Sequence, residues 1–306
     1  LAKSQQDPPP PASLVPDIPE DLNQLCVDLL RRNPGERPSS AEILRRLTAL
    51  PAAPLRLGAE AATGVEKPAF VGRDRHLAQL EACHREVGHG QAAIVFVYGN
   101  SGMGKSALLQ EFTDRVRRSG PTVVLSGRCY EQESVPFKAL DSLVDSLCNH
   151  LRKLPRAEAD ALMPRDIQAL TRVFPVLGRV QAVCDSSRRT LDVQDQQELR
   201  RRAVSALREL LTRIGDRHPL VLVIDDLQWG DVDSAVMLCD LLKPPDAPLL
   251  MFAGAYRAED AQTSPFLQAF RETERRGLQR LNVCELEVGP LSEPDAQYLA
   301  FLLLRQ

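Results

Sequence analysis

The sequence predicts an α/β protein with a five-stranded, mainly parallel sheet that is flanked by helices and preceded by a small all-α segment. From residue 70 onward, short continuous apolar runs alternate with segments of helical periodicity, a pattern typical of parallel sheets. Ten of the 23 prolines fall within the first 54 residues, which sets an N-terminal segment apart from the rest. Hydrophobic residues make up 43% of the chain and charged residues 26%, so a buried core is expected.

The N-terminal segment is expected to contain two helices. Residues 1–19 are rich in proline and polar residues and predict an extended stretch. Leucines and a cysteine repeat at helical spacing over residues 20–32, and Asn33-Pro34-Gly35 is expected to end that helix. Ser39 and Glu42 have the spacing of a capping box that begins a second helix. Because two helices cannot bury both apolar stripes, this segment is expected to belong to something larger.

The other elements follow a linker at residues 51–68, where Ala, Gly and Pro occur without periodicity. Apolar runs predict strands at residues 93–98, 122–127, 220–225, 249–256 and 281–288. Helices are predicted at residues 106–118, 136–182 and 196–214, the second of them interrupted by three prolines. Strands that alternate with helices in this way favour parallel pairing.

Charge, hydropathy and cysteine spacing exclude several classes of protein. The net charge of −3 argues against a uniformly basic nucleic-acid surface. No stretch approaches the roughly 18 apolar residues of a membrane span, so we expect a cytoplasmic protein without membrane contact. The seven cysteines form no CxxC pair and the five histidines have no ligand spacing, so neither a disulfide framework nor a zinc site is expected. The first residues lack both Met and an apolar signal region, which suggests a cut edge.

A glycine-rich segment between the first strand and the following helix carries the clearest chemistry. Residues 99–106 fit the Walker A pattern G-x4-G-K-[ST], whose glycines let successive backbone N–H groups point at phosphate oxygens. Lys105 is expected to reach the β- and γ-phosphates of ATP, and the Ser106 hydroxyl to ligate Mg²⁺. The alternative is an ordinary glycine turn. The predicted nucleotide-binding residues here are Gly99, Asn100, Ser101, Gly102, Met103, Gly104, Lys105, Ser106 and Ala107.

Two adjacent acids end the strand predicted at residues 220–225. Asp225 would lie at the carboxyl edge of the sheet, where open α/β sheets bind ligands, and would hold Mg²⁺ through bound water. Asp226 would point elsewhere and could orient or polarise an attacking water. The alternative is that the pair forms a helix cap or a solvated turn.

Arg257 directly follows the fourth predicted strand, so it could sense the γ-phosphate and stabilise developing charge. A plain surface charge is the alternative. The predicted catalytic residues are therefore Lys105, Asp225, Asp226 and Arg257, and the predicted Mg²⁺ ligands are Ser106 and Asp225.

Together these motifs resemble the STAND or AAA-16 (origin-recognition-like) class of P-loop ATPases. Residues 70–74, Phe-Val-Gly-Arg-Asp, with Leu77 and Leu80 are similar to the N-terminal "FVGRE…L..L" motif of that class. Residues 226–231 with Ser234 resemble its "DDLQWaD..S" phrase. The resemblance covers residues 70–306 and implies a P-loop NTPase core. It also implies that Val71, Gly72 and Arg73 contact the adenine base.

The end of the sequence resembles the point where that class continues into a helical lid. Residues 286–292 look like the last core strand entering the lid, and Ser292 and Asp295 have the spacing that caps its first helix. The chain stops fourteen residues after Ser292. We therefore expect residues 69–306 to form a P-loop ATPase domain whose lid is truncated.

Residues 22–47 resemble the end of a protein-kinase C-terminal lobe, where an arginine in the position of Arg37 pairs with a buried glutamate. This resemblance implies that residues 1–50 are the last helices of an incomplete serine/threonine-kinase-like domain. Because the glycine-rich loop, the HRD and the DFG are absent from the sequence, kinase activity is not expected of this chain. A coincidental two-helix hairpin is the alternative.

The leading functional hypothesis is an ATP-binding and ATP-hydrolysing switch in a multidomain signalling or transcription-regulatory protein linked to a kinase. An origin-recognition-like DNA-associated ATPase and a scaffold that holds ATP without turnover are the alternatives. The basic clusters at 188–189 and 200–202 are interpreted as a solvated helix face, with a DNA patch as the alternative. Trp229 is expected to be a packing anchor beside the segment that carries Asp225 and Asp226. The expected partners are ATP and other domains or proteins, with a possible nucleotide-dependent oligomer and no nucleic acid.

Overall fold

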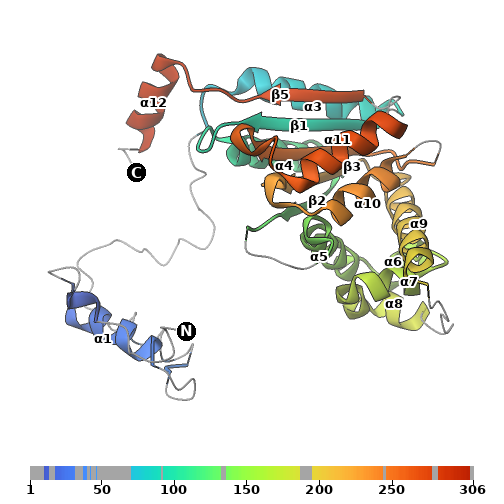
Figure 1. Ribbon diagram of the computed structural model, residues 1–306, viewed down its shortest axis with the longest axis horizontal. Coiled ribbons are helices and arrows are strands. Elements are labelled where there is room, and N and C mark those ends of the chain that lie inside the picture. The colour runs from blue at the N-terminus through green and yellow to red at the C-terminus, as the bar shows by residue number, and fades with distance from the viewer. Residues whose placement is uncertain are drawn as a thin grey trace. The chain divides into compact units, whose positions relative to one another are not determined.

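A computed structural model of the protein divides the chain into two compact units, Leu1–Lys67 and Pro68–Gln306. Figure 1 shows the arrangement of helices and strands within each unit. The structure describes residues 10–13, 18–31, 37–39, 42, 46, 70–90, 92–131, 136–186, 195–243, 246–277 and 282–303.

The first unit contains the 3-10 helix η2 (Pro11–Ser13) and helix α1 (Glu20–Leu29). The stripe expected over 20–32 is only partly covered in the described residues, because Leu25 is buried whereas the other leucines of α1 and its end remain exposed. One half of the expected capping box is present, since Glu42 N donates to Ser39 Oγ at 3.3 Å. The predicted helix stop at 33–35 lies outside the described residues.

Asp28 of α1 is the centre of a small ionic network in this unit. Its carboxylate accepts from Arg46 and from Arg31, each at 2.7 Å. The Arg46 guanidinium is the main cause that lowers the pKa of Asp28. Arg37 donates to the backbone oxygen of Arg31 at 2.9 Å, so the arginine that suggested a kinase lobe has a local partner.

The second unit is built on one sheet of five parallel strands, which confirms the predicted fold class. The strands are β1 (Ala93–Gly99), β2 (Val123–Arg128), β3 (Leu220–Asp225), β4 (Met251–Arg257) and β5 (Asn282–Glu287). Their order across the sheet is β2-β3-β4-β1-β5, and every pair is parallel. All five apolar runs that predicted strands form them, within a residue or two at each end.

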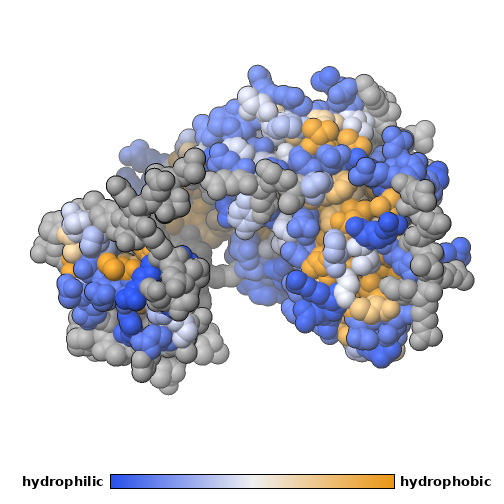
Figure 2. Space-filling model, turned by 60° about the horizontal axis from the view of Figure 1, so that its bottom comes forward, coloured by the Kyte–Doolittle hydropathy of each residue, from blue (hydrophilic) through white to orange (hydrophobic). Residues whose placement is uncertain are grey.

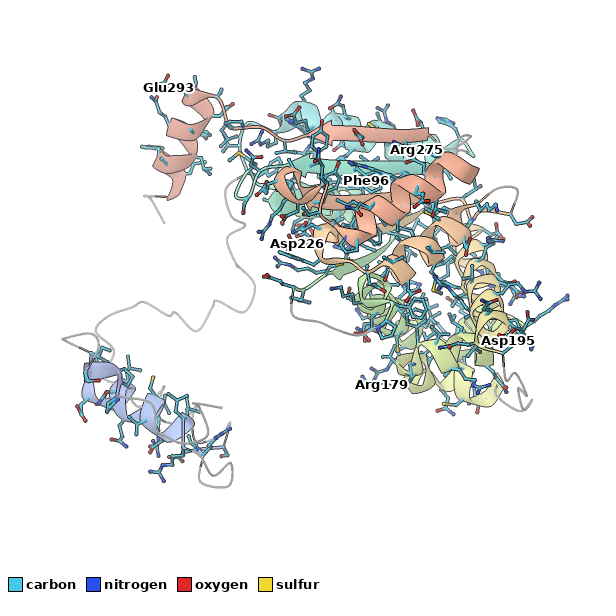
Figure 3. The ribbon with its side chains drawn as sticks, in the orientation of Figure 1. Phe96, Arg179, Asp195, Asp226, Arg275 and Glu293 are labelled. Carbon is cyan, nitrogen blue, oxygen red and sulfur yellow. The ribbon has the colours of Figure 1, made fainter. Side chains whose placement is uncertain are left out.

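Helices cover both faces of the sheet, because alternate strand residues point to opposite sides. On one face, α3 (Asp74–Gly88) and α4 (Lys105–Ser119) pack against the sheet in one apolar cluster. The other face carries α5 (Lys138–Lys153), α9 (Gln196–Gly215), α10 (Val232–Leu242) and α11 (Pro265–Gly277) in a larger cluster. Phe96 of β1 lies in this larger cluster, edge-on to Phe270 with ring centroids 5.1 Å apart (Figure 3).

The helical stretch expected over 136–182 is broken at its prolines, as predicted. After α5, it continues as α6 (Arg156–Leu162), α7 (Ile167–Val173), the 3-10 helix η4 (Pro175–Arg179) and α8 (Gln181–Ser186). Short 3-10 helices η5 (Leu227–Trp229) and η6 (Ala258–Asp260) follow β3 and β4, and α12 (Glu293–Leu303) ends the described chain. Ser292 Oγ accepts from Asp295 N at 3.3 Å, which is the cap expected for α12.

None of the seven cysteines forms a disulfide in the structure. None of the helices in the described parts of the chain combines the length and apolar character needed to cross a bilayer. The space-filling view shows apolar residues scattered among hydrophilic ones on the face it presents (Figure 2).

Shortening Phe112 tests the packing of α4, the helix that follows the glycine-rich segment. The Phe112 ring is fully buried in the cluster under α3 and α4. We expect Phe112→Ala to lower the free energy of unfolding by about 3–5 kcal/mol, because it removes a buried ring and leaves a cavity. Denaturant unfolding followed by circular dichroism measures the change.

The matched control is Val232→Ala at the start of α10, where the side chain is 49% exposed. Its free energy of unfolding is expected to change by no more than about 0.5 kcal/mol. Equal losses in the two variants would contradict the packing assigned to α4.

Candidate functional site

The loop between β1 and α4, residues 99–106, curls in a way that only glycine permits. Gly102 and Gly104 have φ angles of 79° and 87°, and Gly104 is the N-cap of α4. At Gly99, a Cβ atom would lie 2.2 Å from the backbone oxygen of Val288. The loop therefore leads from the strand end directly into the N-terminus of a fifteen-residue helix, an arrangement that suits an anion.

The side chain of Lys105 folds back and bonds to its own loop. Its side chain is buried, and its Nζ donates to the backbone oxygens of Gly99 at 2.7 Å and Asn100 at 2.8 Å. Burial lowers the pKa of Lys105, and the charge of Glu259 opposes that shift. The ammonium group is therefore held by backbone oxygens of its own loop.

Of the two predicted acids, Asp225 ends β3, as expected, and Asp226, labelled in Figure 3, directly follows it. Their carboxylates have different partners. Asp225 accepts a hydrogen bond from the backbone N–H of Asp226 at 3.0 Å. Asp226 has a φ of 55°, a left-handed conformation that Asp tolerates better than most residues. Its Oδ2 accepts from Nε and a terminal nitrogen of Arg128 at 2.9 and 2.7 Å.

Gln228 joins the ends of β3 and β4. Only 2% of this residue is exposed. Its Nε2 donates to Asp226 Oδ1 at 2.9 Å, and its Oε1 accepts from the backbone N–H of Arg257 at 3.2 Å. One buried amide therefore fixes both the second acid and the strand end that carries the predicted sensor arginine.

Arg257 lies beside the glycine loop, because its position on β4 pairs with Gly99 of β1. Its guanidinium carbon is 5.8 Å from the centroid of the Trp229 ring, which is within cation–π distance. Trp229 itself packs against the larger apolar cluster, as the sequence suggested. Burial is the main cause that lowers the pKa of Lys105, and the positive charge of Arg257 acts in the same direction.

Glu259 completes the site from η6, directly after β4. Its Oε1 accepts from the backbone N–H of Ser101 in the glycine loop at 3.1 Å. Its own backbone N–H is the main cause that lowers the pKa of Glu259, and the Ser101 N–H and the charges of Lys105 and Arg257 act in the same direction. The Glu259 carboxylate therefore accepts a hydrogen bond from the Ser101 amide, one of the groups that the sequence assigned to phosphate.

Of the residues predicted to contact adenine, Arg73 contacts the backbone of the glycine loop. Its guanidinium is buried and donates to the backbone oxygens of Met103 at 3.0 Å and Gly289 at 2.5 Å. Gly72 has a φ of 70°, and a Cβ atom there would lie 2.7 Å from the Asp295 carboxylate. Arg73 thus ties the loop to the segment after β5, while base contacts by Val71, Gly72 and Arg73 stay a prediction.

The sequence pointed to the loop and the acids but missed Arg128, Gln228 and Glu259. Each had a weak signal: Arg128 ends the second strand, Gln228 lies within the DDLQW phrase, and Glu259 follows Arg257 by two residues. What makes them part of the site is the strand order, which places the ends of β2, β3, β4 and β1 side by side.

The donors present fit a phosphate and a magnesium ion. The backbone amides at the N-terminus of α4 and Lys105 are donors that suit phosphate oxygens, and the hydroxyl of Ser106 with the carboxylate of Asp225 would provide the hard oxygen ligands that Mg²⁺ prefers. Among the described residues, no group of three or more His, Cys, Asp or Glu could hold a metal ion.

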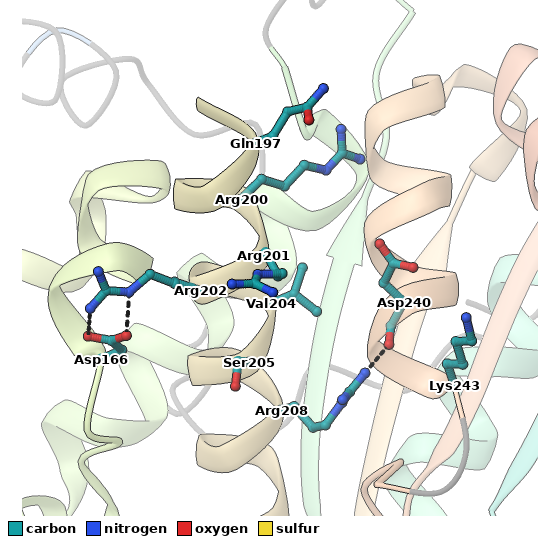
Figure 4. Close-up of a pocket in the computed structure, with 10 residues that line it drawn as sticks. All are labelled: Asp166, Gln197, Arg200, Arg201, Arg202, Val204, Ser205, Arg208, Asp240 and Lys243. Carbon is teal, nitrogen blue, oxygen red and sulfur yellow. Dashed lines mark hydrogen bonds and ion pairs between the residues drawn. The ribbon is translucent and has the colours of Figure 1, made fainter. Parts of the chain in front are cut away.

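The arginine cluster at 200–202 lies apart from this site, in a cavity of about 710 Å³ beside α9 and α10 (Figure 4). Each of its arginines pairs with a carboxylate: Arg200 with Asp233, Arg201 with Glu198 and Arg202 with Asp166, at 2.6–2.7 Å. The choice between a solvated helix face and a nucleic-acid patch for this cluster stays a prediction. The cluster at 188–189 lies outside the described residues.

Comparison with known proteins gives a family match over more than half of the chain. Residues 69–252 match the family model described as AAA ATPase domain. A search of curated proteins finds no match.

Two solved structures illustrate the similarity to proteins of known structure. Drosophila ORC bound to GC-rich DNA and Cdc6 is 13% identical with a TM-score of 0.35, covering 71% of this chain and 60% of that chain. The Aeropyrum pernix ORC1 protein in complex with DNA is 12% identical with a TM-score of 0.40, covering 78% of this chain and 50% of that chain. The chain thus spans 60% and 50% of the lengths of these two chains. Both are bound to DNA, whereas the expectation of no nucleic-acid partner for this chain stays a prediction.

Replacing Gln228 by leucine tests whether its amide holds the two strand ends together. The variant leaves Asp226 Oδ1 and the Arg257 N–H without this partner, so we expect the free energy of unfolding to fall by about 1–3 kcal/mol. The matched control is Gln110→Leu on α4, whose amide also donates to an aspartate, Asp114, but at an exposed position. Its change is expected within about 0.5 kcal/mol. Similar values for both variants in denaturant unfolding would show that the Gln228 bridge adds no stability.

Proposed function

We propose a nucleotide-switch function for this chain, which belongs to the AAA ATPase domain family. In this proposal residues 69–306 bind ATP with Mg²⁺, hydrolyse it, and change conformation between the two states. One observation carries the proposal. The strand pairing sets Arg257 of β4 opposite Gly99, where the glycine loop begins, and the Gln228 amide joins the Arg257 backbone to Asp226, so the loop, the second acid and the predicted sensor arginine lie at one edge of the sheet.

Binding would begin with an exchange of partners in the loop. Lys105 Nζ would leave the oxygens of Gly99 and Asn100, to which it now donates, for the β- and γ-phosphates. The backbone N–H groups of the loop and the N-terminus of α4 would hold the remaining phosphate charge. Ser106 and Asp225 would hold Mg²⁺, which neutralises phosphate charge when bound.

Hydrolysis would use the acid that is not a metal ligand. In this step a water oxygen bonds to the γ-phosphorus, the bond to the β–γ bridging oxygen breaks, and Asp226 accepts the proton of the water. Asp226 is held by Gln228 on one oxygen and by Arg128 on the other, so its freedom to face a water depends on releasing Arg128. Arg257 would stabilise charge on the transferred phosphate.

The link to a larger signalling protein is the finer part of the proposal. We propose that residues 1–50 are the end of a serine/threonine-kinase-like domain, 51–68 a linker, and 69–306 a STAND-type ATPase domain. The kinase-like sequence of 22–47 supports this, as do the leucines of the first unit that stay exposed in its described part. The partners in this proposal are other domains of the same polypeptide or a protein in the cytoplasm.

Replacing Lys105 by alanine tests nucleotide binding. We expect ATP affinity to fall at least about tenfold, because one buried ammonium that bonds to phosphate is lost. Isothermal titration calorimetry with Mg²⁺–ATP measures the affinity, and Lys243→Ala, an exposed lysine of the arginine-lined cavity, is the matched control. Unchanged ATP affinity in the Lys105 variant would overturn the proposed site.

Replacing Asp226 by asparagine separates a hydrolysing switch from a scaffold that only holds ATP. Turnover is expected to fall by a factor of about 100 or more while ATP affinity is kept, because the amide cannot accept the proton of the water. Asp233→Asn removes a carboxylate of the same type that pairs with Arg200 away from the site, and should keep its turnover. Equal, near-zero phosphate release from parent and Asp226 variant would favour the scaffold.

A further inference from the structure

One contact in the site joins the glycine loop to the segment after β4 and has no place in the proposed cycle. Glu259 lies on η6, whose three residues separate the end of β4 from the turn that precedes α11. Its carboxylate reaches across to the loop and accepts the backbone N–H of Ser101 at 3.1 Å. Both residues are exposed, so neither partner is held there by burial.

The Glu259 carboxylate has the surroundings of a bound phosphate. It is an anion that accepts a hydrogen bond from a loop amide. Burial is the main cause that lowers the pKa of Lys105, and of the neighbouring charges Glu259 opposes that shift most strongly. The charges of Lys105 and Arg257 in turn stabilise it. A phosphate and a carboxylate cannot share one N–H and would repel each other at this distance.

We propose that Glu259 is a built-in competitor for the nucleotide: its carboxylate occupies the Ser101 amide until a phosphate displaces it. This inference rests on the proposed function and deepens it by naming a residue that sets nucleotide affinity. The contact is a single charge-assisted hydrogen bond in an exposed position, strong enough to bias the loop and weak enough to be displaced.

Displacement of the Glu259 carboxylate would also affect the segment that leads from β4 to α11. Glu259 follows Arg257 by two residues, and the same segment continues into α11, which packs against α10. When a phosphate oxygen accepts the Ser101 N–H in place of Glu259, η6 loses this hydrogen bond to the loop. The start of the β4–α11 connection thus differs between the loop with and without phosphate, which is the kind of two-state element that a switch requires.

Nucleotide affinity of Glu259 variants tests the proposal directly. Glu259→Ala and the nearly isosteric Glu259→Gln are expected to bind both Mg²⁺–ATP and Mg²⁺–ADP more tightly than the parent, by about fivefold for alanine. The state in which Glu259 occupies the Ser101 amide lowers the apparent affinity for nucleotide, because only the remaining fraction of the protein can bind. Removing the carboxylate restores the intrinsic affinity. The matched control is Asp260→Ala, which removes the same charge one residue along η6, where the backbone oxygen of Asp260 accepts from Ser264 N at 2.9 Å.

Three results of the titrations would overturn the proposal. Equal affinity in parent and Glu259→Ala would mean that the contact does not compete with phosphate. Weaker binding by the variant would mean that Glu259 assists the nucleotide. An equal gain in Asp260→Ala would assign the effect to the general loss of negative charge.

Hydrogen exchange of the protein without nucleotide tests the contact by itself. The peptide that contains residues 99–104 should exchange faster in Glu259→Ala than in the parent, because the Ser101 amide loses its acceptor, and Asp260→Ala should match the parent. Unchanged exchange would overturn the inference even if nucleotide binds. Absence of nucleotide binding in every variant, together with faster exchange in Glu259→Ala, would overturn the proposed function and keep the contact.

Discussion

The parallel register of the sheet is the constraint on which the site depends. Because all five strands run in the same direction, their carboxyl ends meet at one edge, and pairing sets which ends are neighbours. Gly99 lies opposite Arg257, and Arg128 lies opposite Asp225. A shift of one residue in either pair would turn every side chain of that strand to the other face. The apolar clusters on the two faces therefore fix the chemistry at the edge as well as the stability of the core.

The polar groups at this edge are connected to one another, which keeps them in place without a ligand. Arg128, Asp226, Gln228 and the Arg257 backbone form a chain of hydrogen bonds from the end of β2 to the end of β4. The left-handed backbone of Asp226 is sustained by this chain, since its carboxylate is held on both oxygens. A network of this kind restricts the geometry of the acid more than a solvated carboxylate would.

The sequence alone was sufficient for the strands and the glycine loop, and insufficient for the connections between them. Strands such as 93–99 are visible because a buried parallel strand is a continuous apolar run, and the loop is visible because its backbone demands glycine and Lys. Gln228 and Glu259 were not visible because their partners, Arg257 and Ser101, lie 29 and 158 residues away in sequence. The resemblance assigned Arg73 to the adenine base. In the structure its guanidinium donates to the backbone oxygens of Met103 in the loop and Gly289 after β5.

Two of the groups expected to receive phosphate, the Lys105 ammonium and the Ser101 amide, have protein partners in the structure. Lys105 donates to carbonyls of its own loop, and Ser101 donates to Glu259. For the buried Lys105 this follows from a general requirement, since a polar group that is withdrawn from water is destabilising unless it finds a hydrogen-bond partner. The buried ammonium group of Lys105 must therefore be satisfied within the protein, and the Ser101 amide has an internal acceptor as well. Ligand affinity is then the difference between two sets of hydrogen bonds, and the internal set is as much a determinant of binding as the residues that touch the ligand.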